Sequence, residues 1–138
     1  MKPKLILMSH GNMAYETLQS ARMIAGDLAA AEVVSMEEHD GLAGTQKKLT
    51  ALLDNLGEEE VLILADLKGG TPCNAAMMEM GTRENIRVMS GLNLALIIEA
   101  ALSPIEDIDA LVAYLLPIGK DAVAAINLPE LDDDEYEE

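Results

Sequence analysis

Short, continuous apolar runs alternate along the chain with segments in which apolar residues recur every three or four positions. The continuous runs are 4–9 (KLILMS), 32–36 (EVVSM), 61–65 (VLILA) and 86–90 (IRVMS). A continuous run of this kind is typical of a strand that is buried on both faces of a parallel sheet. The pattern therefore predicts four central strands.

Helical patterns fill the first two intervals between these runs. One helix face is marked over 14–28 by apolar residues at Ala14, Leu18, Ala21, Ala25 and Leu28. The segment 39–45 (HDGLAGT) predicts a loop, and the leucines that follow predict a helix from about Thr45, which Gly57 ends.

Three more helices are expected towards the carboxyl terminus. Thr71 is predicted to cap the first, with Pro72 at its first helical position. The segment 94–102 (LALIIEAAL) predicts the second. The third is expected to open at 103–106 (SPIE), which has a capping-box pattern, and to kink or end at Pro117.

The order of these elements predicts a single α/β domain. Strands that alternate with helices form a parallel sheet that carries helices on both faces. The segment 122–128 (AVAAINL) has the composition of a fifth strand, and 130–138 (ELDDDEYEE) is expected to be a solvated acidic tail. We therefore divide the chain into a domain over 1–128 and a tail over 129–138.

Charge and composition make several classes of function unfavourable for this chain. The formal net charge is −16, which disfavours nucleic acid and anionic membranes and favours a basic protein partner. Cys73 is the only cysteine, so neither an intrachain disulfide nor a cysteine-rich zinc site is expected. No signal peptide or membrane span is predicted, and no metal or cofactor. These features indicate a cytoplasmic domain.

Three polar loops follow the first, third and fourth strands: MSHGN, ADLKGGTPCN and MSGLN. Ligands of parallel sheets bind at this carboxyl edge. If the first and third strands are neighbours, His10 and Asp66 face each other there. A carboxylate that holds one ring nitrogen leaves the other free as a nucleophile or a base.

The turn that follows Asp66 supplies groups that bind anions. Gly69, Gly70 and Thr71 offer backbone N–H groups and a hydroxyl at a helix start, where the helix dipole favours negative charge. A nucleophilic imidazole beside such a turn indicates phosphohistidine chemistry. Ser9 and Gly11, which flank His10, complete the candidate phosphate-binding residues. His39 and Cys73 are expected to have no catalytic role.

Three segments carry a family resemblance: SHG after the first strand, DLKGGTPCN after the third and GLNLALIIEA after the fourth. Over about residues 3–128 the chain resembles the enzyme IIA domain of the mannose/fructose/sorbose family of the bacterial phosphoenolpyruvate-dependent sugar phosphotransferase system. The Asp-Leu-x-Gly-Gly-Thr/Ser-Pro signature is specific to that family. Lys68 departs from it, because the family often has an apolar or aromatic residue there.

The resemblance implies a phosphoryl carrier. His10 would accept phosphate from the phosphocarrier HPr and pass it to an enzyme IIB component on a separate chain, with the membrane components IIC and IID involved indirectly. Asp66 would orient His10, and Gly69, Gly70 and Thr71 would hold the phosphate. The family fold implies strand order 2-1-3-4 and a homodimer that exchanges a C-terminal strand, here 122–128. Peripheral association with the membrane permease is also implied.

Three alternatives remain open at the level of sequence. The chain could be the phosphotransfer subunit of a dihydroxyacetone kinase, or a regulatory protein that responds to phosphorylation of His10. It could also be an unrelated hydrolase or isomerase that uses His10 as a general base, which would require a small-molecule pocket, whereas phosphotransfer to proteins requires an exposed His10 on a rather flat surface.

Overall fold

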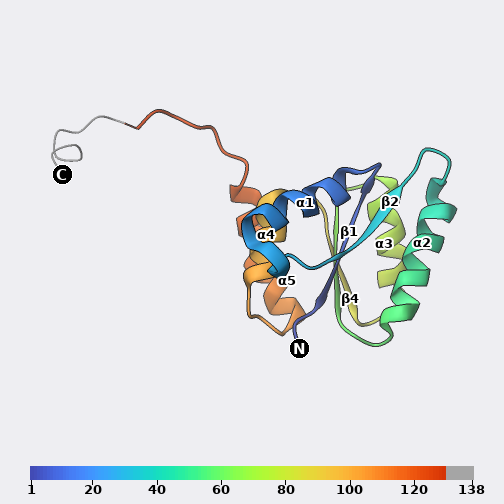
Figure 1. Ribbon diagram of the computed structural model, residues 1–138. Helices are drawn as coiled ribbons and strands as arrows, with labels where there is room; N and C mark the ends of the chain where they lie inside the picture. Colours follow the sequence, from blue (N-terminus) through green and yellow to red (C-terminus); the bar gives the residue numbers. More distant parts are fainter. Residues whose placement is uncertain (130–138) are drawn as a thin grey trace.

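The computed structural model describes residues 1–129, and the acidic tail predicted over 130–138 lies outside the described residues. A four-stranded sheet stands between two layers of helices (Figure 1). The strands are β1 (Lys4–His10), β2 (Glu32–Met36), β3 (Val61–Ala65) and β4 (Ile86–Met89). The helices are α1 (Met13–Ala25), the short 3-10 helix η1 (Gly26–Leu28), α2 (Gly41–Leu56), α3 (Thr71–Met80), α4 (Leu94–Leu102) and α5 (Ile108–Asp121).

All neighbouring strands run parallel, in the order β2-β1-β3-β4, which confirms the expected topology. In the register of β1 with β3, Met8 lies opposite Ala65. In the register of β1 with β2, His10 lies opposite Met36. Every residue of β3 is buried, as the continuous apolar run predicts for a strand with neighbours on both sides.

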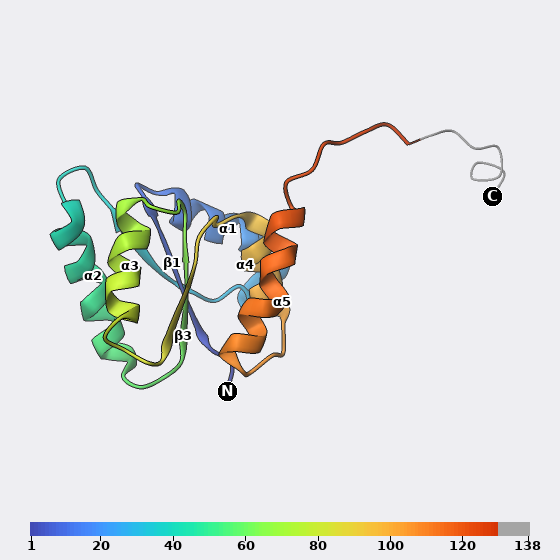
Figure 2. The ribbon, with the colours of Figure 1, turned by 180° about the vertical axis from the view of Figure 1, so that it is seen from behind.

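Alternate residues of the central strands serve two separate cores. Leu5 and Leu7 of β1 pack with residues of α1, α4 and α5, whereas Ile6 and Met8 pack with residues of α2 and α3. Figure 2 shows the same division from behind, with α2 and α3 on one face of the sheet and α1, α4 and α5 on the other. Burial on both faces makes the central strands a rigid support for the loops at their ends.

The start of α2 differs from the sequence-based prediction. The helix begins at Gly41 and not at about Thr45, so most of the predicted loop over 39–45 is helical. Residues 41–43 are exposed, and the first turn therefore carries none of the apolar periodicity that reveals a helix in sequence. The predicted end at Gly57 is confirmed.

Two predicted helix caps are also wrong. Gly70, and not Thr71, is the cap of α3, because Thr71 already adopts the helical conformation. Ser103 ends α4 and accepts a hydrogen bond from the Ile105 N–H, while Asp107 caps α5 through the Ala110 N–H at 2.9 Å. The capping-box pattern at 103–106 thus belongs to the connection between two helices.

Three further expectations are corrected. Pro117 lies inside α5, which continues to Asp121, so Pro117 does not end the helix, and a kink there stays a prediction. Pro117 and Ala113 are exposed, so the carbonyl that loses its N–H partner faces water. Leu28 falls in η1 and is 64% exposed, and therefore does not extend the buried face of α1. The segment 122–128 is not a fifth strand of this sheet, and it leaves the body at the end where β1 finishes (Figure 1); its exchange across a homodimer stays a prediction.

No helix among residues 1–129 is long and apolar enough to cross a membrane.

Candidate functional site

The carboxyl edge of the sheet brings His10 and Asp66 together. Because Met8 lies opposite Ala65, the chain after β3 passes directly beside the last residues of β1. The Asp66 N–H donates to the Met8 carbonyl at 3.0 Å, which extends the ladder by one residue. The expected juxtaposition of His10 and Asp66 therefore follows from the neighbouring positions of β1 and β3.

Two hydrogen bonds join the residues directly. The Nδ1 atom of His10 lies 2.8 Å from Oδ2 of Asp66, and the backbone N–H of His10 donates to the same oxygen at 2.9 Å. An ionised carboxylate only accepts hydrogen bonds, so Nδ1 carries the ring proton in this pair. The Nε2 atom consequently holds the free lone pair.

The electrostatic environment keeps Asp66 ionised. Burial alone would raise the pKa of Asp66, whose side chain is only 8% exposed. Hydrogen bonds from the ring and the backbone of His10, with one from the Leu67 N–H at 2.8 Å, outweigh burial and hold the pKa of Asp66 below its usual value. The His10 side chain is 50% exposed. A buried, fixed acceptor thus orients an accessible imidazole.

Gly70 lies against the edge of the His10 ring. A Cβ atom at residue 70 would be 3.1 Å from Cε1 of His10 and 3.2 Å from the Leu67 carbonyl oxygen. Cε1 is bonded to both ring nitrogens, so this glycine borders the path to Nε2. Gly69 has a φ of +82°, which a residue with a side chain rarely adopts, and this conformation completes the tight turn.

The first turn of α3 presents free donors beside this ring. The Gly70 N–H donates to the Leu67 carbonyl, and the Asn74 N–H donates to the Gly70 carbonyl. Within residues 1–129, the N–H groups of Thr71 and Cys73 have no backbone partner. The cap residue Gly70 has no side chain, so no side-chain oxygen of the cap accepts from these N–H groups.

The remaining predicted site residues lie in the turn between β1 and α1. Ser9 is fully buried; its hydroxyl accepts the Ala14 N–H at 2.7 Å and donates to the Gly11 carbonyl. Gly11 is exposed, has a φ of +53°, and donates its N–H to the Met36 carbonyl at 2.8 Å. Both residues shape the turn that presents His10, and the Ser9 hydroxyl does not face the open surface.

Sequence reasoning missed one group of neighbours, at the end of β2, and correctly expected the third polar loop at this edge. An open hollow beside His10 is also lined by Asn12 and by residues 36–38 at the end of β2. Behind the site, the Gly91 N–H donates to the Asp66 carbonyl at 3.2 Å, which ties the third polar loop to the second. The position of residues 36–38 follows from the pairing of β2 with β1, which no local pattern reveals. Within residues 1–129, no cluster of three or more metal-ligating side chains occurs.

Known proteins share this sequence and geometry. Residues 4–115 match the family described as PTS system fructose IIA component. The chain belongs to this family. The mannose/sorbose-specific IIA subunit from Enterococcus faecalis has 63% sequence identity and a TM-score of 0.93, with 96% of this chain and all of that chain covered. A phosphotransferase system component EIIA from Streptococcus agalactiae has 28% identity and a TM-score of 0.81, covering 88% of this chain and 95% of that one.

Relatives with curated names belong to the same system. The fructose-specific EIIA component of Bacillus subtilis is 31% identical over 69% of this chain and 66% of its own length. The mannose-specific EIIAB component of Escherichia coli K12 is 27% identical over 88% of this chain. This chain spans only 39% of the length of that E. coli protein.

Proposed function

We propose that the chain is a phosphoryl carrier of a sugar phosphotransferase system, which accepts phosphate on His10 from phospho-HPr and passes it to an enzyme IIB component. The observation that carries the proposal is the His10–Asp66 pair, in which a buried carboxylate fixes Nδ1 and leaves Nε2 free on a half-exposed ring. Membership of the IIA family supports the same reaction.

Phosphoryl transfer depends more on how the protein positions the two imidazoles than on covalent catalysis by other side chains. The Nε2 lone pair attacks the phosphorus of the donor phosphohistidine, and a new N–P bond forms as the donor N–P bond breaks. The departing bond pair returns to the donor imidazole. The ring of His10 keeps its Nδ1 proton and gains positive character, which the adjacent Asp66 carboxylate stabilises. Transfer to enzyme IIB is the same step with a new acceptor, so each transfer is reversible.

Donors for the phosphoryl oxygens are present beside Nε2. We assign this role to the N–H groups of Gly69, Thr71 and Cys73 and to the Thr71 hydroxyl, whereas Gly70 borders the path to Nε2 with its own N–H bonded to the Leu67 carbonyl. Gly11 shapes the exposed turn after β1, and its N–H is already donated to the Met36 carbonyl. Ser9 acts as a positioning residue and not as a phosphate ligand, because its hydroxyl is buried and already bonded.

The surroundings of His10 suit a protein partner better than a small substrate. The hollow beside the ring is open and is lined by Glu37 and Glu38. An isomerase or hydrolase that used His10 as a base would need an enclosed pocket to exclude water. An acidic rim attracts a basic partner surface, so protein phosphocarriers are the favoured donor and acceptor.

We further propose a homodimer in which residues 122–128 pair with a second copy. Val123, Ile126 and Leu128 are 85%, 91% and 93% exposed in the single chain, and apolar side chains of an extended segment gain stability when they are covered. Contact with the membrane components IIC and IID would be indirect, through enzyme IIB, in the cytoplasm.

Labelling from phosphoenolpyruvate through enzyme I and HPr tests the function. We expect one phosphate on His10 that is labile in acid and stable in alkali, as a phosphoramidate is. His10→Ala should abolish labelling. His39→Ala is the matched control and should leave it intact, because the Nε2 atom of His39 lies 3.5 Å from the Glu37 carboxylate and 3.8 Å from that of Asp40 and is not left free to attack phosphorus. Label that survives His10→Ala, or that resists acid, would refute the proposal.

A further inference from the structure

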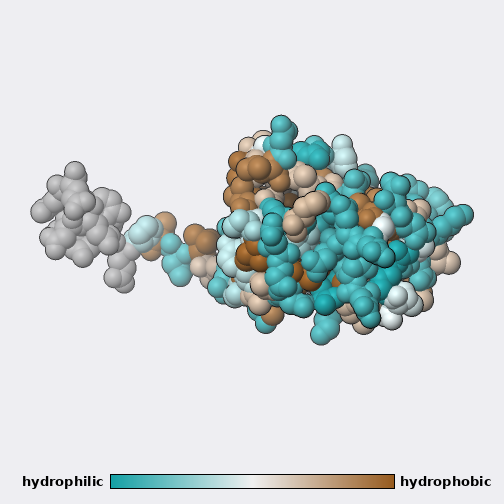
Figure 3. Space-filling view, turned by 90° about the horizontal axis from the view of Figure 1, so that it is seen from below, coloured by the Kyte–Doolittle hydropathy of each residue, from teal (hydrophilic) through white to brown (hydrophobic). Residues whose placement is uncertain are grey.

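A second concave site lies at the opposite end of the sheet from His10. The hollow has a volume of about 490 Å³, within the usual range for small-molecule sites, and sits where β1 and β2 begin. Figure 3 views the molecule from this end, and hydrophobic residues appear there among a largely hydrophilic surface. The lining comes from the N-terminal segment, α1, β2 and the ends of α2 and α4.

This hollow concentrates positive charge in a strongly acidic chain. Lys2, Lys4 and Arg22 line it, three of the nine Lys and Arg residues in a chain of net charge −16. Glu32 is the only carboxylate among the lining residues. Within residues 1–129, none of the three cations forms an ion pair, whereas Lys48, Arg83 and Arg87 elsewhere are paired with aspartates. The positive charge here is therefore available to an anion.

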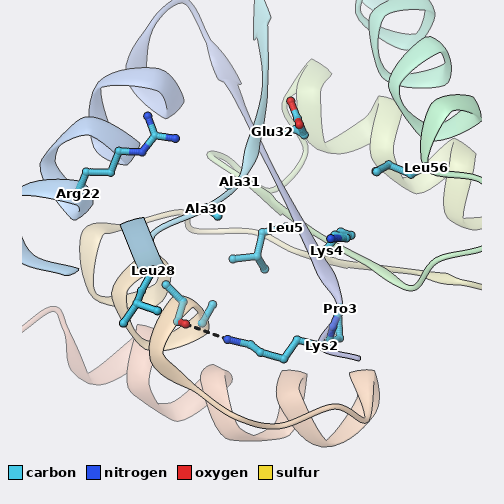
Figure 4. A pocket seen from close by; sticks show the side chains of 12 residues that line it. Lys2, Pro3, Lys4, Leu5, Arg22, Leu28, Ala30, Ala31, Glu32 and Leu56 are labelled. Atoms are coloured by element: carbon cyan, nitrogen blue, oxygen red, sulfur yellow. Dashed lines mark hydrogen bonds between the residues drawn. The ribbon is translucent and has the colours of Figure 1, made fainter. Parts of the chain in front are cut away.

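Two of these cations are held in place by backbone carbonyls. The Lys2 ammonium donates to the Ala101 carbonyl at 2.8 Å, the bond drawn in Figure 4, and the Arg22 Nε donates to the Ala29 carbonyl at 3.2 Å. Each bond satisfies a backbone carbonyl near a helix end and uses one hydrogen-bond donor of the Lys2 or Arg22 side chain. The two terminal nitrogens of Arg22 remain, in the fork that binds oxyanions through two parallel hydrogen bonds.

The rest of the lining is apolar. Leu5, Leu28 and Leu56 contribute to the hollow together with alanines from α4 and from the segment before β2. Figure 4 shows Leu5 between the cationic side chains and Leu28 projecting beside the Lys2 ammonium. A ligand that fits this lining carries both an anionic group and an apolar body. Three cations against one carboxylate match a dianion better than a monocarboxylate.

We propose that this hollow binds a small phosphate monoester with an apolar body, at a site separate from His10. The Arg22 fork holds the phosphate, Lys2 and Lys4 add positive charge to the same hollow, and the leucines cover the organic part. Occupancy leaves the carboxyl edge free, so ligand and protein partner bind at the same time. The proposal does not depend on phosphoryl transfer by His10.

The test is an NMR titration of the ¹⁵N-labelled full chain with phenyl phosphate, inorganic phosphate and benzyl alcohol. We expect saturable shifts of the Ala30, Ala31 and Ala101 amides with phenyl phosphate, weaker binding of inorganic phosphate, and none of benzyl alcohol. The double variant Lys2→Gln/Arg22→Gln should weaken binding of phenyl phosphate by about tenfold or more, the scale of losing one charge-assisted contact. Lys47→Gln, an exposed cation on α2, is the matched control and should bind normally.

The His10→Ala variant separates this site from the transfer site, and it should bind phenyl phosphate like the parent. The proposal fails if these amides show no saturable shift at millimolar phenyl phosphate, or if the double variant binds as the parent does. Loss of binding in His10→Ala would move the anion to the carboxyl edge and would equally refute it. Equal affinity for inorganic and phenyl phosphate would contradict the part assigned to the leucines.

Discussion

Two residues determine what the His10 ring can do. Asp66 accepts from both the ring and the backbone N–H of His10, which fixes the ring orientation and the protonated nitrogen. Gly70 approaches the ring so closely that a side chain at this position would meet Cε1. The reactivity of Nε2 thus depends on a hydrogen bond on one side and on vacant space on the other.

Replacement of Asp66 tests the hydrogen bond. In Asp66→Asn an amide can donate to Nδ1, which favours the tautomer with its proton on Nε2 and removes the nucleophilic lone pair. We expect transfer from phospho-HPr to slow by roughly 10²–10⁴-fold, the scale of general acid–base and orienting effects. The melting temperature should change little, because the backbone bonds of Asp66 to Met8 and Gly91 remain. A transfer rate equal to that of the parent would disprove the orienting role.

A pair of glycine variants tests the vacant space. Gly70→Ala introduces a Cβ atom 3.1 Å from His10 Cε1 at a φ of −79°, which alanine adopts without strain. We expect slower transfer with a small loss of stability. Gly69→Ala is the matched control: its Cβ meets nothing within 4 Å, but its φ of +82° costs about 1–2 kcal/mol. Rapid transfer kinetics and thermal unfolding of both variants separate the two effects, and unimpaired transfer by Gly70→Ala would contradict the steric argument.

At the scale of single residues, the sequence predicts which residues lie at the strand ends better than it predicts what the side chains next to His10 do. His10 and Asp66 each follow a continuous apolar run, and parallel pairing of β1 with β3 necessarily brings them to one edge. The burial of Ser9 was not predictable, because a serine before a turn is equally compatible with a ligand contact or with a bond to the following helix. The hydrogen bond from the Ala14 N–H to the Ser9 hydroxyl decides between a ligand contact and a helix contact.

At the scale of elements, the third polar loop supports the site without lining it. The Gly91 and Leu92 N–H groups donate to the carbonyls of Asp66 and Ala65, at 3.2 and 2.9 Å. Asn93 then caps α4 by accepting the Leu96 N–H at 3.0 Å and donates to the Gly119 carbonyl in α5 at 3.2 Å. One side chain therefore joins two helix ends directly behind Asp66.

Substitutions of Asn93 separate its two bonds. Asn93→Ala removes both and should lower the free energy of unfolding by about 1–2 kcal/mol, since a lost helix cap alone costs 0.5–2 kcal/mol. Asn93→Asp keeps the cap oxygen but loses the donor to Gly119, so it should fall between the parent and the alanine variant. Urea unfolding measures both differences. Equal stability of the alanine variant and the parent would show that Asn93 does not stabilise the contact between α4 and α5.

Element boundaries were predictable where an apolar face or a glycine marks them and failed where neither does. The span of α4 and the end of α2 match the prediction, since periodicity and Gly57 define them. The start of α2 was missed because its first turn is exposed. The start of α5 was misplaced because Ser103 and Asp107 both have side chains that cap helices, and the structure uses Asp107.

At the scale of the whole molecule, the two ends of the sheet differ in character. The carboxyl edge carries the imidazole, the free N–H groups of α3 and an acidic rim, whereas the amino edge carries the basic hollow. The segment after α5 leaves at the carboxyl edge (Figure 1), and within residues 1–129 its side chains are exposed. Sequence composition predicted a strand here, but strand formation needs a partner that a single chain does not provide.

The proposed homodimer follows from this segment. We expect the full chain to be dimeric at micromolar concentration in light scattering, because covering Val123, Ile126 and Leu128 removes three almost fully exposed apolar side chains from water. The triple variant Val123→Ser/Ile126→Ser/Leu128→Ser should be monomeric and should keep its helical circular dichroism, since none of the three side chains packs on the domain. Met23→Ser removes an equally exposed apolar side chain, 88% accessible on α1, and should leave the dimer intact. A monomeric parent, or a triple variant that still dimerises, would show that this segment does not join two copies.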